Sequence, residues 1–184
     1  DAPGLSRQSF RLADGRGAAH LTLQGVPAQA LGGDADIGAL LERTYGEACL
    51  ALCADTLGAS QALNALTLAY LKERRQFGVP IGSYQALQHR MVELYMLETE
   101  GRAVLNAAHR AGPDARRAAT HAALAHVMHL GRQASHEAVQ MHGGIGVTEE
   151  LAVSHYFRRI LVNNRLLGDR AAHLRRFAEA QGLT

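Results

Sequence analysis

The sequence lacks tryptophan, and aromatic residues make up only 5% of its 184 residues, so aromatic stacking platforms are scarce. It also lacks an excess of one charge, because 19 Lys and Arg oppose 17 Asp and Glu and leave a net charge of +2. This near balance gives no reason to expect nucleic acid or an anionic membrane as a partner. No apolar run has membrane-spanning length and no signal peptide opens the chain, which favours a cytoplasmic protein.

Patterns that form disulfides or hold metals are sparse as well. Cys49 and Cys53 are four residues apart in a predicted helix, where the geometry suits a disulfide poorly, so two buried thiols are the preferred interpretation. Of the 10 histidines, His126, His129 and His136 could share one helical face. Metal sites in four-helix bundles typically use Glu-x-x-His pairs, which this sequence lacks. It therefore predicts no metal site.

The residues that are present predict a mainly α-helical domain preceded by a short β-hairpin. Hydrophobic residues make up 47% of the chain, which is enough for a core. Residues 8–30 alternate in polarity around a turn at Asp14-Gly15, and a loop over residues 32–34 follows. Two strands alone are only marginally stable. We therefore expect them to pack on helices or to belong to a sheet whose other strands lie outside this chain.

From residue 36 onward the apolar residues recur every three or four positions, which predicts helices. Short connections between these helices predict an antiparallel four-helix bundle. The predicted helices span residues 36–74, 84–110, 114–142 and 148 into the basic tail, with a break near Gly168. We expect Ser83, Asp114 and Thr148 to cap the second, third and fourth helices.

The same spacing predicts which residues face the core. In the first helix these are Leu40, Leu41, Tyr45, Leu52, Leu57, Leu63, Leu66 and Tyr70. In the third helix they form an alanine-rich face of Ala122, Ala125, Met128, Ala134, Ala138 and Met141. Gly46 and Gly58 interrupt the first helix, at a cost of about 1 kcal/mol each relative to alanine. We attribute each glycine to close packing against a neighbouring helix.

The corner between the first two helices gathers groups that suit a ligand. Arg74, Gln76 and Phe77 crowd the end of the first helix, and Tyr84 and Gln85 open the second. Gly78 fits a left-handed position, and Pro80 blocks continuation of the helix. A guanidinium, two amides and two rings would suit a ligand that carries a phosphate and a flat ring. The alternative interpretation is an ordinary helix end with surface hydrogen bonds.

A second candidate is the stretch Gln140-Met141-His142-Gly143-Gly144-Ile145-Gly146. Its glycines would let the backbone come close to a ligand and offer amides to phosphates. An ordinary helix stop is the alternative. No strand precedes this stretch, so it is not the phosphate loop of a dinucleotide-binding βαβ unit.

These two stretches carry a resemblance to a known family. Arg-x-Gln-Phe-Gly-x-Pro-Ile followed by Tyr-Gln-x-Leu-Gln within residues 70–88, and Gln-Met-His-Gly-Gly-Ile-Gly-Val-Thr-Glu-Glu at 140–150, resemble the acyl-CoA dehydrogenase family. The resemblance implies that residues 1–34 are the tail of a middle β-domain and that residues 35–184 are the C-terminal four-helix bundle. It also implies that the chain is a piece of a longer subunit.

The resemblance implies a reaction and a cofactor. A glutamate takes the α-proton of an acyl-CoA thioester, hydride leaves the β-carbon for the flavin of FAD, and an electron-transferring flavoprotein or similar acceptor receives the electrons. The FAD of this family lies across a subunit interface. Arg74 would bind its pyrophosphate, with Gln76 and Phe77 beside it, for the neighbouring subunit. Tyr84 and Gln85 would meet the adenosine side, and Gln140, Gly143 and Gly144 would line the adenine-end half-site.

The acyl site departs from the family pattern. The two family positions for the catalytic glutamate fall on Leu167 and Ala48, so no catalytic residue is predicted in this chain. A substrate-contacting arginine falls on Cys49, and Asp169 replaces a threonine expected to contact FAD.

The chain therefore resembles the small subunit, without the base, of heteromeric acyl-CoA dehydrogenases that act on pimeloyl-CoA or steroid side chains. It would assemble with a glutamate-bearing paralogue into a heterotetramer that contains two copies of each subunit. Two alternatives are an active homo-oligomer that uses Glu47 or Asp169 as base, and a non-catalytic oligomerisation module.

Overall fold

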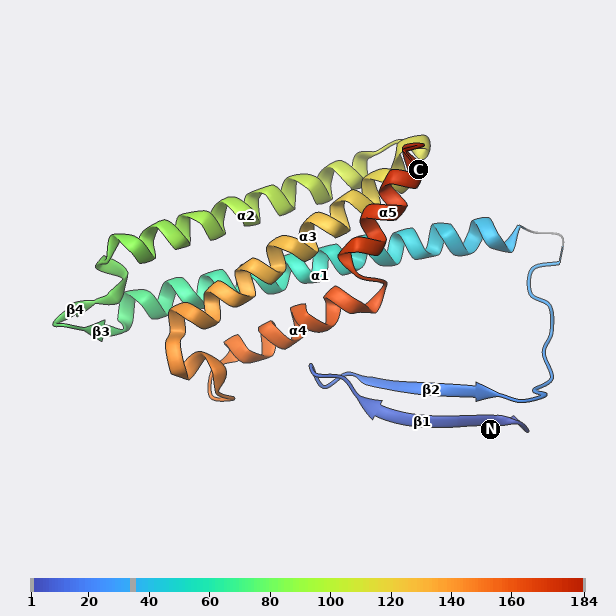
Figure 1. Ribbon diagram of the computed structural model, residues 1–184, viewed down its shortest axis with the longest axis horizontal. Coiled ribbons are helices and arrows are strands. Elements are labelled where there is room, and N and C mark those ends of the chain that lie inside the picture. The colour runs from blue at the N-terminus through green and yellow to red at the C-terminus, as the bar shows by residue number, and fades with distance from the viewer. Residues whose placement is uncertain (1, 34–35, 184) are drawn as a thin grey trace.

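The computed structural model describes residues 2–33 and 36–183, which are mainly helical (Figure 1). The strands are β1 (Leu5–Arg11), β2 (Gly17–Leu23), β3 (Arg75–Gln76) and β4 (Val79–Pro80). The helices are α1 (Ile37–Glu73), α2 (Gln85–Arg110), α3 (Pro113–His142), α4 (Ala152–Leu166) and α5 (Arg170–Ala180), with short 3-10 turns η1 (Ile81–Ser83) and η2 (Gly143–Val147). The predicted boundary between the two domains at residues 34 and 35 lies outside the described residues.

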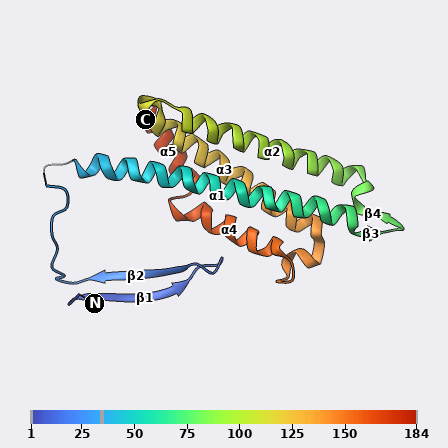
Figure 2. The same cartoon turned by 180° about the vertical axis from the view of Figure 1, so that it is seen from behind.

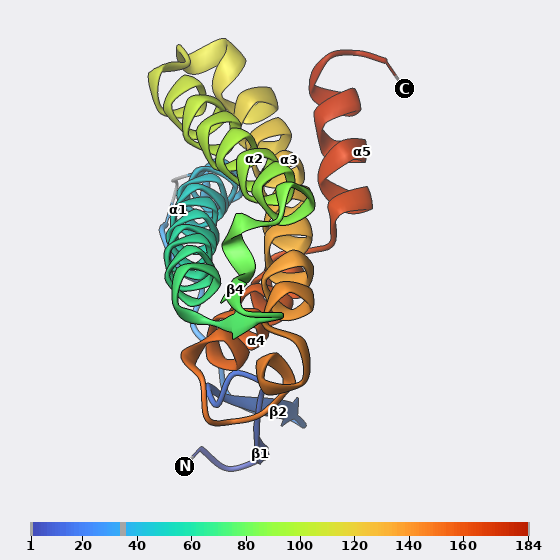
Figure 3. The same cartoon turned by 90° about the vertical axis from the view of Figure 1, so that its left-hand side faces the viewer.

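The long helices form the predicted antiparallel bundle, in which α3 contacts each of the other four helices (Figures 1 and 2). Seen end-on, α1, α2, α3 and α4 group together, whereas α5 stands outside them beside α3 (Figure 3). The predicted break separates α4 from α5 at Gly168, whose φ of 106° suits a residue without a side chain. Among the described helices, none combines the length and apolar character that crossing a membrane requires.

The predicted core face of α1 is confirmed in the middle of the helix and wrong at its start. Leu57 and Leu63 are buried, but Leu40 and Leu41 are 53% and 63% exposed, and Leu66 is also exposed. The first turns of α1 extend past the ends of α2 and α3 (Figure 1), so these two helices leave Leu40 and Leu41 uncovered. Of the alanine-rich face predicted for α3, only Ala122 is half-buried rather than buried.

The close packing predicted at Gly46 and Gly58 is wrong, because a Cβ at either position would meet no neighbouring atom within 4 Å. Close approach occurs instead on α2 and α3. A Cβ on Gly101 would lie 2.9 Å from Leu57 Cδ1, and one on Gly131 would lie 2.8 Å from Thr56 Cγ2. These two glycines therefore let α2 and α3 pack closely against α1.

The three predicted helix caps are wrong. The Ser83 hydroxyl donates to the Pro80 carbonyl at 2.7 Å, and the Thr148 hydroxyl donates to the Ile145 carbonyl at 2.9 Å. Both side chains thus close the turns that precede α2 and α4 and leave the helix amides to other partners. Asp114 lies inside the first turn of α3, because Pro113 takes the first helical position that its fixed φ favours.

The predicted hairpin is confirmed, with β1 pairing antiparallel to β2 from Leu5 opposite Leu23 to Arg11 opposite Gly17. Its strands are largely exposed, and its turn docks on the helices (Figure 1). Arg16 Nη2 donates to Asn163 Oδ1 on α4 at 2.8 Å. The network continues from α4 to α1, where Arg159 Nε donates to Asp55 at 2.9 Å.

This network gives a pH-dependent prediction for stability. Burial alone would raise the pKa of Asp55, but hydrogen bonds from Arg159 and Asn163 and the nearby arginine charges hold it below its ordinary value of 3.8. A carboxylate with a lowered pKa stabilises the fold at neutral pH, and this stabilisation is lost as the pH falls through the folded-state pKa. We expect Asp55→Asn to reduce the free energy of unfolding by about 1–2 kcal/mol at pH 7, measured by denaturant titration.

The difference between wild type and Asp55→Asn should shrink as the pH falls below the ordinary carboxyl pKa of 3.8, because the unfolded chain then binds a proton that the folded carboxyl takes up only at lower pH. Glu149→Gln is the control, since Glu149 pairs with Arg158 on the exposed surface of the protein, where an ion pair contributes little. A difference that stays constant from pH 7 to pH 3 would contradict a stabilising role for the Asp55 charge.

Candidate functional site

The corner after α1 is a tight β-hairpin rather than a simple helix end. Arg74 caps α1, with its backbone N–H donating to the Tyr70 carbonyl at 2.8 Å. β3 then pairs with β4 around a two-residue turn, in which Phe77 and Gly78 have φ values of 52° and 83°. Positive φ at both central residues is typical of the hairpin turns that match strand twist. The left-handed position predicted for Gly78 is confirmed, but it belongs to this hairpin.

The hairpin raises its side chains into solvent. Phe77 at its tip is 91% exposed. The Arg75 guanidinium donates to the Gly78 carbonyl at 3.0 Å and so braces the hairpin. The Arg74 guanidinium makes no hydrogen bond or ion pair with any described residue. Arg74 therefore presents its charge to whatever approaches this end of the bundle.

The chain returns from the hairpin to α2 by packing closely on α1. A Cβ on Gly82 would lie 2.9 Å from the Leu71 carbonyl oxygen, so only glycine allows this approach. Tyr84 and Gln85 follow at the start of α2 and are exposed. The corner is thus firmly attached to the bundle while its side chains remain accessible.

The second motif forms the turn that ends α3. Gly143 has a φ of 66° and caps the helix, and the 3-10 turn η2 follows. A Cβ on Gly146 would lie 2.8 Å from the Val139 carbonyl oxygen, so the turn folds back onto α3. Gln140, Gly143 and Gly144 are exposed at this turn.

The structure brings the two motifs to the same end of the bundle. The rings of Tyr70 on α1 and His142 on α3 stack with centroids 4.4 Å apart, and the Tyr70 hydroxyl donates to the His142 carbonyl at 3.3 Å. Tyr70 precedes Arg74 by four residues, about one helical turn, and His142 directly precedes Gly143. The eight predicted cofactor-binding residues are all exposed at this end: Arg74, Gln76, Phe77, Tyr84, Gln85, Gln140, Gly143 and Gly144. Their roles in binding a cofactor stay predictions.

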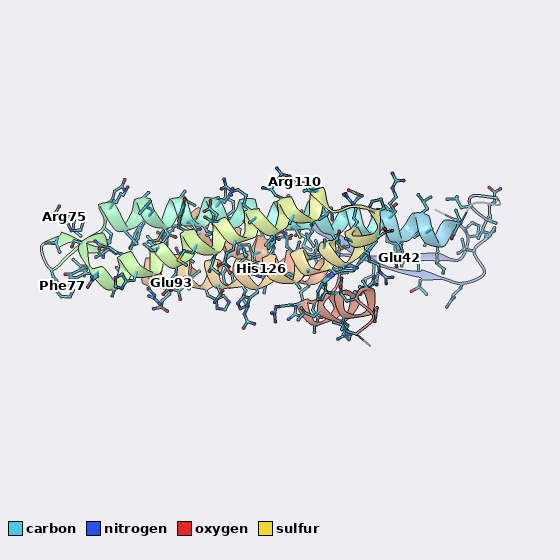
Figure 4. The ribbon with its side chains drawn as sticks, turned by 90° about the horizontal axis from the view of Figure 1, so that it is seen from above. Glu42, Arg75, Phe77, Glu93, Arg110 and His126 are labelled. Atoms are coloured by element: carbon cyan, nitrogen blue, oxygen red, sulfur yellow. The ribbon has the colours of Figure 1, made fainter. Side chains whose placement is uncertain are left out.

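The two family positions for the base lie toward the other end of α1. Leu167 is half-buried, and its carbonyl accepts the Tyr45 hydroxyl, whereas Ala48 is exposed. Arg74 follows Ala48 by 26 positions of helix, which corresponds to about 39 Å along the helix axis. Figure 4 shows Arg75 and Phe77 at one end of the bundle and Glu42 toward the opposite end.

The acids near the base positions are already engaged. Glu47 Oε1 pairs with Arg116 on α3 at 2.8 Å. Asp169 caps α5 by accepting the Ala172 N–H at 2.8 Å, and this hydrogen bond lowers the pKa of the Asp169 carboxyl below its ordinary value. A carboxylate with a lowered pKa is a weaker proton acceptor.

Sequence reasoning missed a buried group of Cys49 on α1, His121 on α3 and His173 on α5. The two imidazoles face each other, with Nδ1 atoms 3.1 Å apart. The three residues come from three helices and share no local spacing, so no sequence pattern could have found them. The histidines singled out from the sequence are not part of this group. His126 pairs with Glu100 at 3.5 Å, and His129 and His136 are exposed.

Comparison with known proteins identifies the family. Residues 40–182 match the family model described as acyl-CoA dehydrogenase, C-terminal domain. The chain belongs to the acyl-CoA dehydrogenase family.

Curated relatives agree with this membership. The chain is 41% identical over 133 residues to acyl-CoA dehydrogenase IpdE2 of Mycolicibacterium smegmatis. The aligned region covers 70% of this chain and 40% of IpdE2. IpdE2 of Mycobacterium tuberculosis is 43% identical over 129 residues, with the same coverage of 70% and 40%. The chain thus spans less than half the length of these two relatives.

Solved structures of acyl-CoA dehydrogenases share the fold. A steroid acyl-CoA dehydrogenase variant, Tcur3481–Tcur3483, matches with a TM-score of 0.87 and 34% identity over 99% of this chain and 50% of that chain. The ChsE4–ChsE5 complex of Mycobacterium tuberculosis matches with a TM-score of 0.87 and 27% identity over 100% and 50%. These matches confirm the predicted resemblance, including its likeness to the heteromeric type.

Proposed function

We propose that this chain is the helical part of an acyl-CoA dehydrogenase subunit that completes the FAD site of a neighbouring subunit. The observation that carries the proposal is the separation of about 39 Å along α1 between the exposed Arg74 corner and Ala48. One dinucleotide cannot bridge that span. The corner and the chain's own acyl position therefore belong to two different cofactor sites.

The residues at the corner fit the phosphate end of FAD. Arg74 offers a guanidinium that no described residue engages, and its planar fork suits bidentate phosphate binding. Gly143 and Gly144 offer exposed backbone at the end of α3, where a side chain would hinder close approach. Phe77 at the tip of the hairpin and Tyr84 at the start of α2 supply exposed rings. Gln76, Gln85 and Gln140 supply amides for polar contacts.

We further propose that the partner subunit supplies the proton acceptor. Leu167 and Ala48 cannot take a proton, and the nearby acids are held by Arg116 and by the α5 amides. When bound, FAD would supply the hydride acceptor for the acyl β-carbon. The partner's glutamate would take the α-proton, the product would be a trans-2-enoyl-CoA, and an electron-transferring flavoprotein or similar acceptor would receive the electrons. The heteromeric names of the two structural relatives support this arrangement.

Co-expression tests the proposal. The complete protein should lack dehydrogenase activity alone, and it should gain flavin absorbance and acyl-CoA-dependent dye reduction when expressed with a glutamate-bearing paralogue. A steroid-derived acyl-CoA is the first substrate to assay, because one structural relative is described as a steroid enzyme. Full activity of the protein without a partner would overturn the proposal that the partner subunit supplies the proton acceptor. Absence of flavin from the assembled protein would instead favour the alternative that the chain is a non-catalytic oligomerisation module.

A further inference from the structure

The buried group of Cys49, His121 and His173 is unusual because it places three metal-binding side chains in the core. Cys49 and His173 are 0% exposed and His121 is 2% exposed. One ligand atom of each lies within 4.8 Å of the others. They come from α1, α3 and α5, so the group links the helix outside the bundle to two helices inside it (Figure 3).

The spacing of the two imidazoles matches a metal site. Two nitrogens bound to one tetrahedral zinc at about 2.0–2.1 Å lie roughly 3.3 Å apart. The Nδ1 atoms of His121 and His173 are 3.1 Å apart. A zinc-bound sulfur would lie roughly 3.6 Å from each nitrogen, so a separation of up to 4.8 Å between ligand atoms would have to close by about 1.2 Å.

The polar atoms of the group are incompletely used by the protein. His173 Nε2 is buried and has no hydrogen-bond partner among the described residues. Only one proton can lie between two Nδ1 atoms, so one imidazole must present a bare nitrogen to the other. The bare nitrogen accepts that proton in an ordinary hydrogen bond, which a metal bound between the rings would replace with two metal–nitrogen bonds. His173 Nε2 is the other nitrogen of its ring and would not be part of this metal site.

We propose that Cys49, His121 and His173 bind one zinc ion, with a water molecule or the nearby Tyr45 oxygen as fourth ligand. A thiolate and two imidazoles are a ligand set that zinc prefers. The site would fasten α5 to α1 and α3 close to Leu167, whose carbonyl accepts the Tyr45 hydroxyl. It lies away from the Arg74 corner, so it does not depend on the proposed flavin site.

A metal ion would reach the group past charges of both signs, because Arg176 and Arg117 lie near His121 as well as Glu42. Burial, with smaller contributions from His173, Arg176 and Arg117, lowers the pKa of His121 to about 4, so this imidazole is neutral and ready to bind metal at pH 7. Burial raises the pKa of Cys49 to about 11, so zinc must displace its proton, and the thiolate then offsets part of the metal charge. His121 lines a cavity of about 230 Å³ that gives an entry path to the group. The charged residues that line it are Glu42, Glu47, Arg43, Arg116 and Arg117.

Zinc content and X-ray absorption of the complete assembled protein test the site. After loading with zinc and gel filtration in the presence of a competing chelator, we expect about one zinc per chain. The absorption spectrum should show one sulfur at about 2.3 Å and two imidazole nitrogens at about 2.0–2.1 Å. The bound flavin does not interfere with this measurement.

Cys49→Ser and His173→Gln should weaken zinc binding by more than the 10- to 100-fold that loss of an outer-shell partner typically costs. Cys53→Ser is the matched control, because Cys53 is an equally buried thiol on α1 but is not part of the group. It should bind zinc like the wild type. No zinc in the wild-type protein, a spectrum without sulfur, or equal loss in Cys53→Ser would overturn the proposal. The wild-type spectrum decides the matter even where a variant fails to fold.

Discussion

Replacing Arg74 by alanine in the assembled protein is expected to weaken FAD binding by about 10- to 100-fold. Charge-assisted hydrogen bonds contribute about 1.5–3 kcal/mol each, and a factor of ten corresponds to about 1.4 kcal/mol. The Arg74 guanidinium has no partner among the described residues, so its removal breaks nothing within the bundle. The loss should therefore appear in FAD affinity, measured by flavin fluorescence after reconstitution of the apoprotein, and not in the helix content or unfolding temperature of the apoprotein.

Lys72→Ala is the matched control for Arg74→Ala. Lys72 is an exposed cation two residues earlier in the last turn of α1. Its removal should leave FAD affinity nearly unchanged, since a charge on the helix surface is largely screened by solvent. Arg74→Lys should recover only part of the affinity, because an ammonium cannot form the bidentate phosphate contact. Equal losses in Lys72→Ala and Arg74→Ala would show that the effect is a general change in charge.

The second large effect concerns the base. Glu47→Gln and Asp169→Asn in this chain are expected to leave kcat unchanged. The corresponding change at the partner's glutamate should lower kcat by about 10²- to 10⁴-fold, as loss of a positioned base typically does. Asparagine is as good an N-cap as aspartate, so the α5 cap survives the Asp169→Asn change. Gln at position 47 loses only the exposed pair with Arg116.

Turnover of these variants under saturating acyl-CoA separates the alternatives. A drop of 100-fold or more in Glu47→Gln or Asp169→Asn would identify a base in this chain and favour an active homo-oligomer. A drop confined to the partner's glutamate would place the chemistry in the partner. The unfolding temperature of each variant, measured in parallel, distinguishes a chemical effect from a loss of fold.

Most of the fold could be predicted because its signals are local. Apolar spacing marked the helices, Gly112-Pro113 marked the turn before α3, and Asp14-Gly15 marked the hairpin turn. The incorrect predictions concern positions whose burial or close packing depends on residues distant in the sequence. Leu40 is exposed because the start of α1 extends past α2 and α3. Gly131 packs closely against α1 and a Cβ on Gly58 would meet no neighbouring atom, but no local feature of the sequence distinguishes the two glycines.

The candidate site shows the same division. The corner at Arg74 and the turn at Gly143 are each visible in the sequence, and the predicted antiparallel bundle places the ends of α1 and α3 at the same end. The Tyr70–His142 contact that joins these two ends was not visible in the sequence. The Cys49–His121–His173 group was not visible at all, since tertiary packing alone brings its members together. Local patterns thus predicted the two halves of the proposed flavin site and gave no sign of the proposed zinc site.

The structure of the assembled protein with FAD bound tests the central claim most directly. The account predicts that the Arg74 guanidinium lies within hydrogen-bonding distance, about 2.7–3.2 Å, of the pyrophosphate of an FAD whose ring system is held by the neighbouring subunit. It also predicts that the Gly143-Gly144 backbone borders the same cofactor. An FAD bound entirely within one subunit, with Arg74 facing open solvent, would contradict the account.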